Sequence, residues 1–153
     1  YELDYTILRP SNAYGSRQNP NGIQGAISVF LGKVSNNEPV EIWGNGEVVR
    51  DYIYIEDLVD GIYKAAITPA EQKIFNLGSG IGYSLNQIVD AIRVVTEKDV
   101  RVIHKDKRVF DVPEIFLDIS RAKEILHWTP DTSLEVGIKN TWKFVKEIQL
   151  FHV

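Results

Sequence analysis

The sequence contains no cysteine and no methionine. Without cysteine the chain can form no disulfide, no thiolate metal site and no thiol nucleophile, and this composition fits a reducing compartment. A complete translated chain normally begins with methionine, so its absence indicates a fragment, a processed chain or an excerpt. The opening residues, Tyr1 to Leu8, alternate like a strand taken from the middle of something larger.

Long apolar runs and an excess of positive charge are missing as well. No uninterrupted apolar run is long enough to span a bilayer, and the first residues lack the order of a signal peptide. Seventeen basic and twenty-one acidic residues give a net charge of −4, which argues against wrapping on nucleic acid. We therefore expect a cytoplasmic protein without a membrane or nucleic-acid partner, in which any anion site is local.

What is present indicates one globular domain. The 153 residues are 44% hydrophobic and 25% charged, which is ordinary globular composition. Strand and helix patterns alternate, which indicates an α/β domain. The expected strands are a buried one through Tyr5, Ile7 and Leu8, then 40–43, 73–77, 100–104 and a short piece at 115–119. The expected helices carry Ile27 to Val34, Leu58 to Ile67, Leu85 to Thr96, Ala122 to Leu126 and Leu134 to Val145.

Local signals refine these boundaries. Ser11 to Gly25 is rich in Asn, Gly, Ser and Pro, so we expect a loop there. Ser84 with Gln87, and Thr132 with Glu135, have the spacing of capping boxes at helix starts. The helix after Glu56 is expected to bury one apolar face, made of Leu58, Val59, Ile62, Tyr63, Ala66 and Ile67.

The stretch from Ile42 to Gly61 contains the most informative residue, Arg50. Gly44 and Gly46 flank Asn45, which predicts a tight reversal between short strands. Arg50 follows among residues that favour extended, buried backbone. A guanidinium in such surroundings needs an anionic partner, which is either Asp51 or a ligand phosphate.

Other motifs point to particular chemistries less strongly. Gly78-Ser79-Gly80 has neither the lysine of a phosphate loop nor the G-x-G-x-x-G spacing, so a plain turn is favoured. The three histidines are scattered, and we expect no metal site. Two or three of the arginines Arg9, Arg50 and Arg108 could meet in a cleft that binds a diphosphate.

Four motifs occur in order along the chain: LRPSNAYGSRQ, IWGNGEVVRDYIYIEDLVDGIYKA, FNLGSG and RVFDVPEIFLDISRAKEILHWTP. Taken together, they resemble the C-terminal part of the NAD-dependent sugar-nucleotide epimerase/dehydratase family. These proteins are extended short-chain dehydrogenases, exemplified by UDP-glucose 4-epimerase. The resemblance is collinear over almost the whole chain.

The resemblance implies that the chemistry lies outside this sequence. Members bind NAD through a G-x-x-G-x-x-G turn in an N-terminal Rossmann part and oxidise the sugar with a Tyr-x-x-x-Lys pair. Neither motif occurs here. Residues 1–153 would form a single C-terminal substrate-binding region, with two parallel strands of the Rossmann sheet and a small α/β cap, and would be inactive alone. The parent protein is expected to be a homodimer.

The resemblance also assigns site residues. Asn12 matches a contact to the substrate diphosphate, Pro10 and Ser11 pass beside the nicotinamide of NAD, and Gln24 matches a substrate-binding asparagine. Arg50 matches the arginine that grips the diphosphate. Arg108 and Asp111 match a pair that holds phosphate and ribose. Ile42 and Trp43 match the strand end that borders uracil, with tryptophan where phenylalanine or tyrosine is common.

We therefore expect the substrate-binding portion of a UDP-hexose 4-epimerase, with a UDP-sugar as ligand. A 4,6-dehydratase or a UDP-glucuronate decarboxylase is the alternative within the family, because both begin with the same oxidation. A non-catalytic nucleotide-binding module is the alternative from another class.

Overall fold

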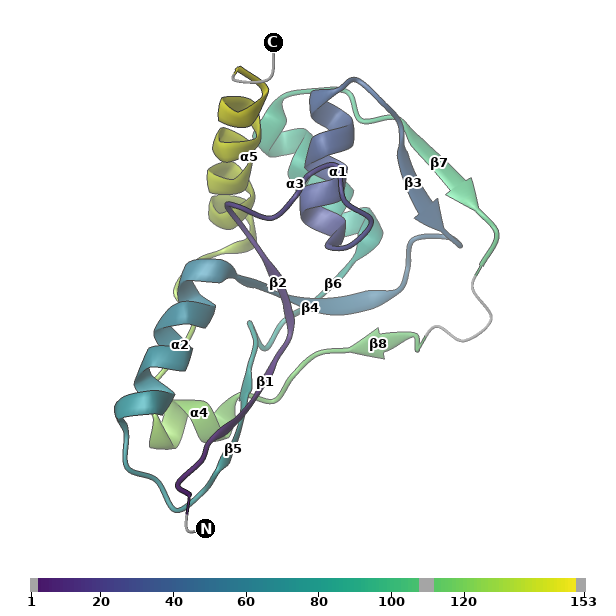
Figure 1. The fold of residues 1–153 in the computed structure, drawn as a ribbon. Coiled ribbons are helices and arrows are strands. Elements are labelled where there is room, and N and C mark those ends of the chain that lie inside the picture. Colours follow the sequence, from purple (N-terminus) through teal and green to yellow (C-terminus); the bar gives the residue numbers. More distant parts are fainter. Residues whose placement is uncertain (1–2, 108–111, 151–153) are drawn as a thin grey trace.

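The computed structural model describes residues 3–107 and 112–150 of the chain. Helices and short strands alternate along it (Figure 1). The strands are β1 (Ile7–Pro10), β2 (Asn12–Tyr14), β3 (Val40–Trp43), β4 (Val49–Tyr54), β5 (Ile74–Leu77), β6 (Gly82–Ser84), β7 (Val102–Lys105) and β8 (Glu114–Ile115). The helices are α1 (Ala26–Ser35), α2 (Ile55–Ile67), α3 (Leu85–Thr96), α4 (Ser120–Ile125) and α5 (Leu134–Leu150). The predicted α/β class is confirmed.

The strands form three small sheets. β1 pairs in parallel with β5, and β3 pairs in parallel with β7. β4 is the centre of the third sheet, where it pairs in parallel with β2 and β8 and antiparallel with β6. β2 lies inside the stretch Ser11 to Gly25, so the prediction of a loop throughout that stretch was wrong at its start.

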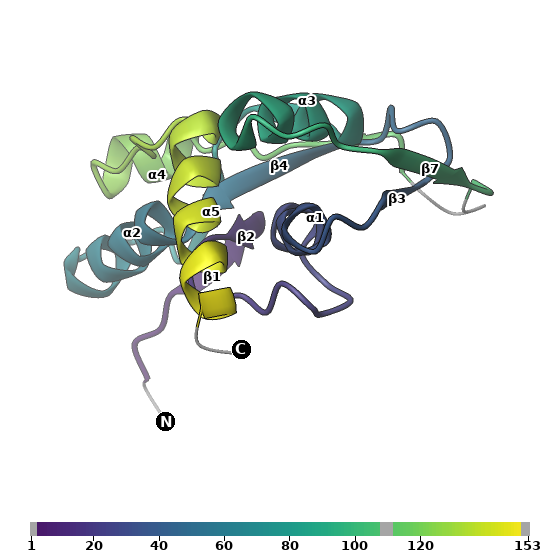
Figure 2. The same cartoon turned by 90° about the horizontal axis from the view of Figure 1, so that it is seen from above.

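Strand β4 separates two hydrophobic cores. Tyr52 and Tyr54 point into the core under α1, α3 and α5, whereas Ile53 points into the core between α2, α4 and β5. This split follows from the alternation of side chains along a strand. Figure 2 shows the same division from above, with α1 and α3 on one side and α2 and α4 on the other. β4 therefore touches both halves of the fold.

The helices begin largely where the sequence predicts. Ile27, Phe30, Leu31 and Val34 of α1 are all buried, as expected. The capping box at Ser84 is present and starts α3.

The last helix starts differently from the prediction. The hydroxyl of Ser133 accepts a hydrogen bond from the N–H of Val136. The N–H of Thr132 donates a hydrogen bond to the Asp57 carboxylate. The predicted cap at Thr132 was therefore one residue too early.

The surface of α2 and β1 differs from the expected burial. Val59, Tyr63 and Ile67 of α2 are more than half exposed, and the helix instead buries Leu58, Gly61 and Ala65. Tyr5 is 60% exposed, so the prediction of a buried first strand was also wrong. Parallel sheets are normally covered on both faces by other elements. In the described residues, the sheet of β1 and β5 packs on one face against the core that includes α2 and α4.

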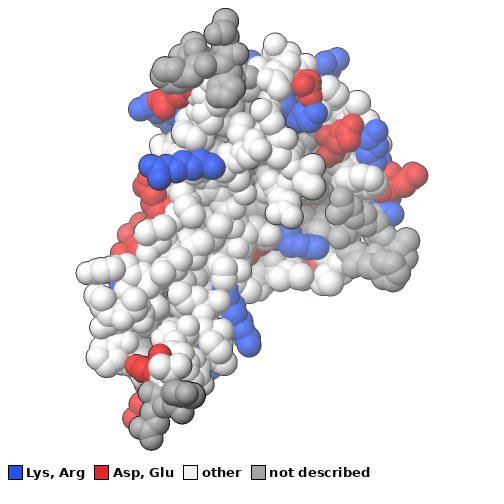
Figure 3. Space-filling model, viewed as in Figure 1, with Lys and Arg blue, Asp and Glu red and all other residues white. Residues whose placement is uncertain are grey.

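Charged side chains of both signs are mixed over much of the surface, while the area over α2 in this view is largely uncharged (Figure 3). In the ranges that the structure describes, no helix is long and apolar enough to cross a membrane.

Buried tyrosines predict a loss of stability at alkaline pH. Burial raises the pKa of Tyr52 to about 12, although Arg50 opposes this, and burial also raises the pKa of Tyr14. Because the neutral ring is favoured in the fold, the stabilisation is complete below pH 10 and is lost as the pH rises toward 12. Ionising Tyr52 should cost roughly 2–3 kcal/mol.

We expect Tyr52→Phe to flatten the fall in unfolding free energy between pH 10 and pH 12, as measured by urea denaturation. Tyr63→Phe is the matched control, because its ring is 61% exposed. Equal slopes for Tyr52→Phe and the unchanged chain would contradict the assignment.

Candidate functional site

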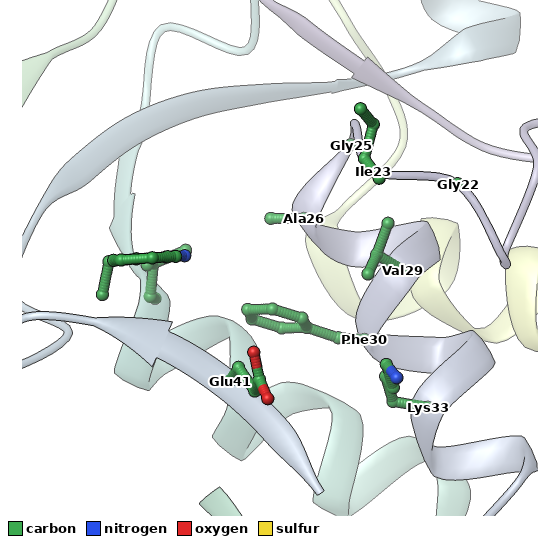
Figure 4. A pocket seen from close by; sticks show the side chains of 10 residues that line it. Gly22, Ile23, Gly25, Ala26, Val29, Phe30, Lys33 and Glu41 are labelled. Atoms are coloured by element: carbon green, nitrogen blue, oxygen red, sulfur yellow. The ribbon is translucent and has the colours of Figure 1, made fainter. Parts of the chain in front are cut away.

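A cavity of about 460 Å³ lies between α1 and β3. Its volume falls in the range of small-molecule sites, about 300–1,000 Å³. Figure 4 shows the Phe30 ring reaching from α1 toward β3, with Lys33 on the helix side and Glu41 on the strand side. The lining residues are Gly22, Ile23, Gly25, Ala26, Val29, Phe30, Lys33, Glu41, Trp43 and Leu85.

The alternation along β3 decides which of its residues reach this cavity. Val40 and Ile42 are buried in the core under α1, whereas Glu41 and Trp43 face outward and line the cavity. Ile42 is only 1% exposed, so its side chain belongs to the core, and any contact of this strand end with a ligand would come from its backbone. Trp43 is 45% exposed and lines the cavity, as a base-contacting residue would.

One backbone edge of β3 faces away from β7. The N–H of Val40 is donated to the carbonyl of Arg101 at 2.8 Å, and that of Gly44 to Lys105 at 2.9 Å. Because backbone groups alternate between the two edges of a strand, the N–H and C=O of Glu41 point to the other edge. No described strand pairs with β3 on that edge. Glu41 therefore offers one donor and one acceptor beside the cavity.

The charged residues of the cavity are held by local ion pairs. Lys33 contacts Glu38, and this hydrogen bond raises the pKa of Lys33. The Glu41 carboxylate lies 3.6 Å from the Lys105 ammonium. Both charges of the cavity rim are thus balanced within the chain.

Arg50 lies on β4 and anchors its guanidinium on carbonyl groups. Nη1 donates to the carbonyl of Val49 at 2.7 Å and to that of Val112 at 2.8 Å. A guanidinium has five N–H groups. Those of Nε and Nη2 have no partner among residues 3–107 and 112–150. Within the described part of the chain, the arginine is therefore oriented by two carbonyl groups, and its Nε and Nη2 donors are left for another partner.

Asp51 is not the partner of Arg50. Its carboxylate is 1% exposed and accepts five hydrogen bonds, none of them from a cation. The donors are the Ser11 hydroxyl, the N–H and hydroxyl of Ser79, and the N–H groups of Gly80 and Leu117. Of the two partners considered for Arg50, the structure excludes Asp51.

The same network explains the glycine-rich turn after β5. The N–H groups of Ser79 and Gly80 form an anion-binding concavity of the kind that holds phosphates. Asp51 fills it, at 2.8 Å from the Ser79 nitrogen and 3.1 Å from that of Gly80. The interpretation of this segment as a structural turn agrees with these contacts.

Three predicted site residues follow one another at the end of β1. Pro10 is exposed, and Ser11 donates to Asp51. The Asn12 side chain donates to the backbone carbonyl of Asp51 at 2.8 Å, which leaves its oxygen and one N–H for another partner. Asn12 is thus bonded to β4, the strand that carries Arg50. By the resemblance, both residues contact the diphosphate.

The turn at Gly44 and Gly46 connects two sheets. Both glycines have positive φ, 76° and 80°, as predicted. The turn joins two short strands, β3 and β4, which belong to different sheets and do not pair with each other. Asn86 at the start of α3 holds the turn, because its side chain donates to the carbonyl of Asn45 and its N–H to that of Gly46.

Gln24, Arg108 and Asp111 are the remaining predicted site residues. Gln24 is exposed between Ile23 and Gly25, which line the cavity, but is not itself a lining residue. Arg108 and Asp111 lie outside the described residues.

Arg9 lines a second cavity of about 220 Å³ with Ile74, Asn76, Asp118 and Arg121. Neither Arg50 nor any residue of the larger cavity borders it. Among the described residues, Arg9 and Arg50 therefore do not line a common cavity.

Several lining residues were missed from the sequence. Ala26, Phe30 and Lys33 were assigned only to a helix, and Glu41 to no role. The signal for Glu41 was available, because alternation along a strand puts it on the same face as Trp43.

Comparisons with known proteins identify the family. The family model described as "NAD dependent epimerase/dehydratase family" matches residues 1–78. The UDP-glucose 4-epimerase of Mycolicibacterium smegmatis is 33% identical over 147 residues, covering 95% of this chain and 47% of that protein. The dTDP-4-dehydro-6-deoxyglucose reductase of Escherichia coli is 38% identical over 142 residues, covering 93% and 44%.

Among solved structures, the UDP-glucose 4-epimerase of Thermotoga maritima with UDP-glucose superposes with a TM-score of 0.92 at 38% identity, covering 97% of this chain and 48% of that one. The fold is therefore that of extended short-chain dehydrogenases. The chain belongs to the NAD-dependent epimerase/dehydratase family. It spans about half the length of the curated relatives that it matches.

Proposed function

We propose that this chain binds the nucleotide diphosphate of a UDP-sugar, as the substrate-binding portion of a UDP-hexose 4-epimerase. The observation that carries the proposal is the combination of the cavity beside Trp43 with the anchored, outward-facing guanidinium of Arg50. The names of the relatives support a sugar nucleotide, because they include a UDP-glucose 4-epimerase and a structure that holds UDP-glucose.

The base would occupy the cavity between α1 and β3. Uracil has an N–H between two carbonyl groups, so it can pair with a backbone C=O and N–H such as those of Glu41. The Trp43 indole would contact the base, since aromatic side chains pack on the flat face of any base. Gln24, beside the lining residues Ile23 and Gly25, would contact the nucleotide at the mouth of the cavity.

The diphosphate would lie against Arg50 and Asn12. Arg50 keeps N–H groups on Nε and Nη2, which suit bidentate binding of phosphate oxygens. Asn12 keeps one N–H. Arg108 and Asp111, which lie outside the described residues, are proposed to hold phosphate and ribose.

In this proposal, the residues of this chain contact NAD on one side of the nicotinamide only. Pro10 offers an exposed ring, while the Ser11 hydroxyl is already donated to Asp51. When bound, NAD would supply hydride transfer, and we propose that it is held mainly by an N-terminal Rossmann part outside residues 1–153. That part would also carry the catalytic Tyr-x-x-x-Lys pair, so this chain alone should not interconvert UDP-sugars. A homodimeric parent protein in the cytoplasm remains a prediction.

Removing the Trp43 ring tests the base position. Base stacking on an aromatic ring is worth about 1–3 kcal/mol, so Trp43→Ala should weaken UDP binding about tenfold or more in isothermal titration calorimetry. Tyr63→Ala is the matched control, because it removes another exposed ring on α2 that does not line the cavity. Equal affinities for the two variants would contradict the proposed base site.

A further inference from the structure

Asp51 is a buried carboxylate that forms no ion pair with any cation among residues 3–107 and 112–150. A buried carboxylate is costly unless its oxygens are fully hydrogen-bonded. Here Oδ1 accepts from the Ser11 hydroxyl at 2.9 Å and from the hydroxyl and N–H of Ser79 at 2.8 Å each. Oδ2 accepts from Gly80 at 3.1 Å and Leu117 at 3.2 Å. The carboxylate is thus stabilised entirely by neutral donors.

These donors come from three separate segments. Ser11 follows the carboxyl end of β1, Ser79 and Gly80 follow the carboxyl end of β5, and Leu117 lies between β8 and α4. The carboxyl ends of parallel strands are where ligands bind in open α/β sheets. Asp51 therefore ties that edge of the β1–β5 sheet to β4.

Strand alternation links this tie to the nucleotide site. Arg50 and Asp51 are neighbours whose side chains leave opposite faces of β4, and the Asp51 carbonyl accepts the side chain of Asn12. One residue thus holds Ser11 through its side chain and Asn12 through its backbone. Arg50 has no such direct bond to the end of β1.

We propose that Asp51 is a positioning residue of the nucleotide site, and that its carboxylate holds the end of β1, at Pro10 and Ser11, against the strands β2 and β4 that carry Asn12 and Arg50. This inference rests on the proposed function. The end of β1 and the sheet of β2 and β4 both contribute residues to the proposed site, so their separation must be fixed, because a misplacement of about 1 Å can cost up to about 100-fold.

The site has no spare room around the carboxylate. A Cβ added at Gly78 would lie 2.4 Å from Asp51 Oδ2, so a longer side chain cannot replace aspartate. Asparagine has the same shape but replaces one oxygen by an NH₂ group. In either orientation, at least one N–H of Ser79, Gly80 or Leu117 then loses its acceptor.

The test compares Asp51→Asn with Asp57→Asn. The Asp57 carboxylate also accepts backbone N–H groups, from Thr132 at 3.0 Å and Asp131 at 3.4 Å, but neither partner belongs to the nucleotide site. Both variants should melt at lower temperature. At a temperature where circular dichroism shows both folded, Asp51→Asn should weaken UDP binding about tenfold, whereas Asp57→Asn should change it less than about twofold.

Unchanged UDP affinity in a folded Asp51→Asn would overturn the positioning role and leave the proposed function intact. If Asp51→Asn does not fold, Ser79→Ala decides in its place, because it removes one hydroxyl donor and keeps the backbone N–H. If the unchanged chain binds no UDP, the proposed function fails. The backbone amide chemical shifts of Asn12 and Arg50 then test the positioning role. Relative to the unchanged chain, these shifts should change in Asp51→Asn and should not change in Asp57→Asn.

Discussion

Arg50→Ala is expected to weaken UDP binding by about 100-fold, which corresponds to about 2.7 kcal/mol. Two carbonyl groups hold its Nη1, so the remaining donors are already aimed before the ligand arrives. Charge-assisted, bidentate contacts with phosphate are among the strongest hydrogen bonds in proteins. Isothermal titration calorimetry at low and moderate salt measures the effect.

One further variant separates the planar set of N–H donors of Arg50 from its positive charge, and a second serves as a control. Arg50→Lys keeps the charge but loses the planar donor set, so it should recover only part of the affinity. Arg101→Ala is the matched control, because Arg101 also donates to a carbonyl, that of Asn37, and does not line the cavity. An affinity for Arg50→Ala within twofold of the Arg101→Ala value would exclude Arg50 from the diphosphate site.

Trp128→Ala is expected to lower the unfolding free energy by about 3–5 kcal/mol. The ring is completely buried and packs so closely on α2 that a Cβ at Gly61 would lie 2.9 Å from it. Its Nε1 donates to the carbonyl of Asp57 at 3.1 Å. The substitution leaves a cavity and removes the additional hydrogen bond to the Asp57 carbonyl, which urea denaturation should register.

Trp128→Phe keeps most of the packing and should lose markedly less stability than Trp128→Ala. Since Trp128 lies in the core between α2, α4 and β5, UDP affinity should be unchanged wherever the variants are folded. A loss below about 1 kcal/mol for Trp128→Ala would show that this core does not depend on the ring.

Local chemistry in the sequence predicted the helices well. The capping box at Ser84 gave the start of α3, and the spacing from Ile27 to Val34 gave the buried face of α1. Local signals failed where distant pairing decides. Asn12 to Tyr14 looked like loop but pairs with Tyr52 to Tyr54, about forty residues later.

The site was predictable only in part, for the same reason. Trp43 and Arg50 were assigned through the resemblance; Trp43 lines the cavity and Arg50 donates to the Val112 carbonyl, and their roles stay predictions. Strand alternation alone predicts that the Ile42 side chain is buried. The Asp51 network could not be foreseen, because its donors lie 40, 28 and 66 residues away at Ser11, Ser79 and Leu117.

The central claim is that the cavity between α1 and β3, together with Arg50, binds UDP. Titrating UDP into the ¹⁵N-labelled chain tests it most directly. We predict saturable shifts of the Trp43 indole N–H and of the Arg50 amide, with no shift at Ile138 in the core under α5. Unchanged spectra at millimolar UDP, or shifts confined to the cavity around Arg9 and Arg121, would contradict it.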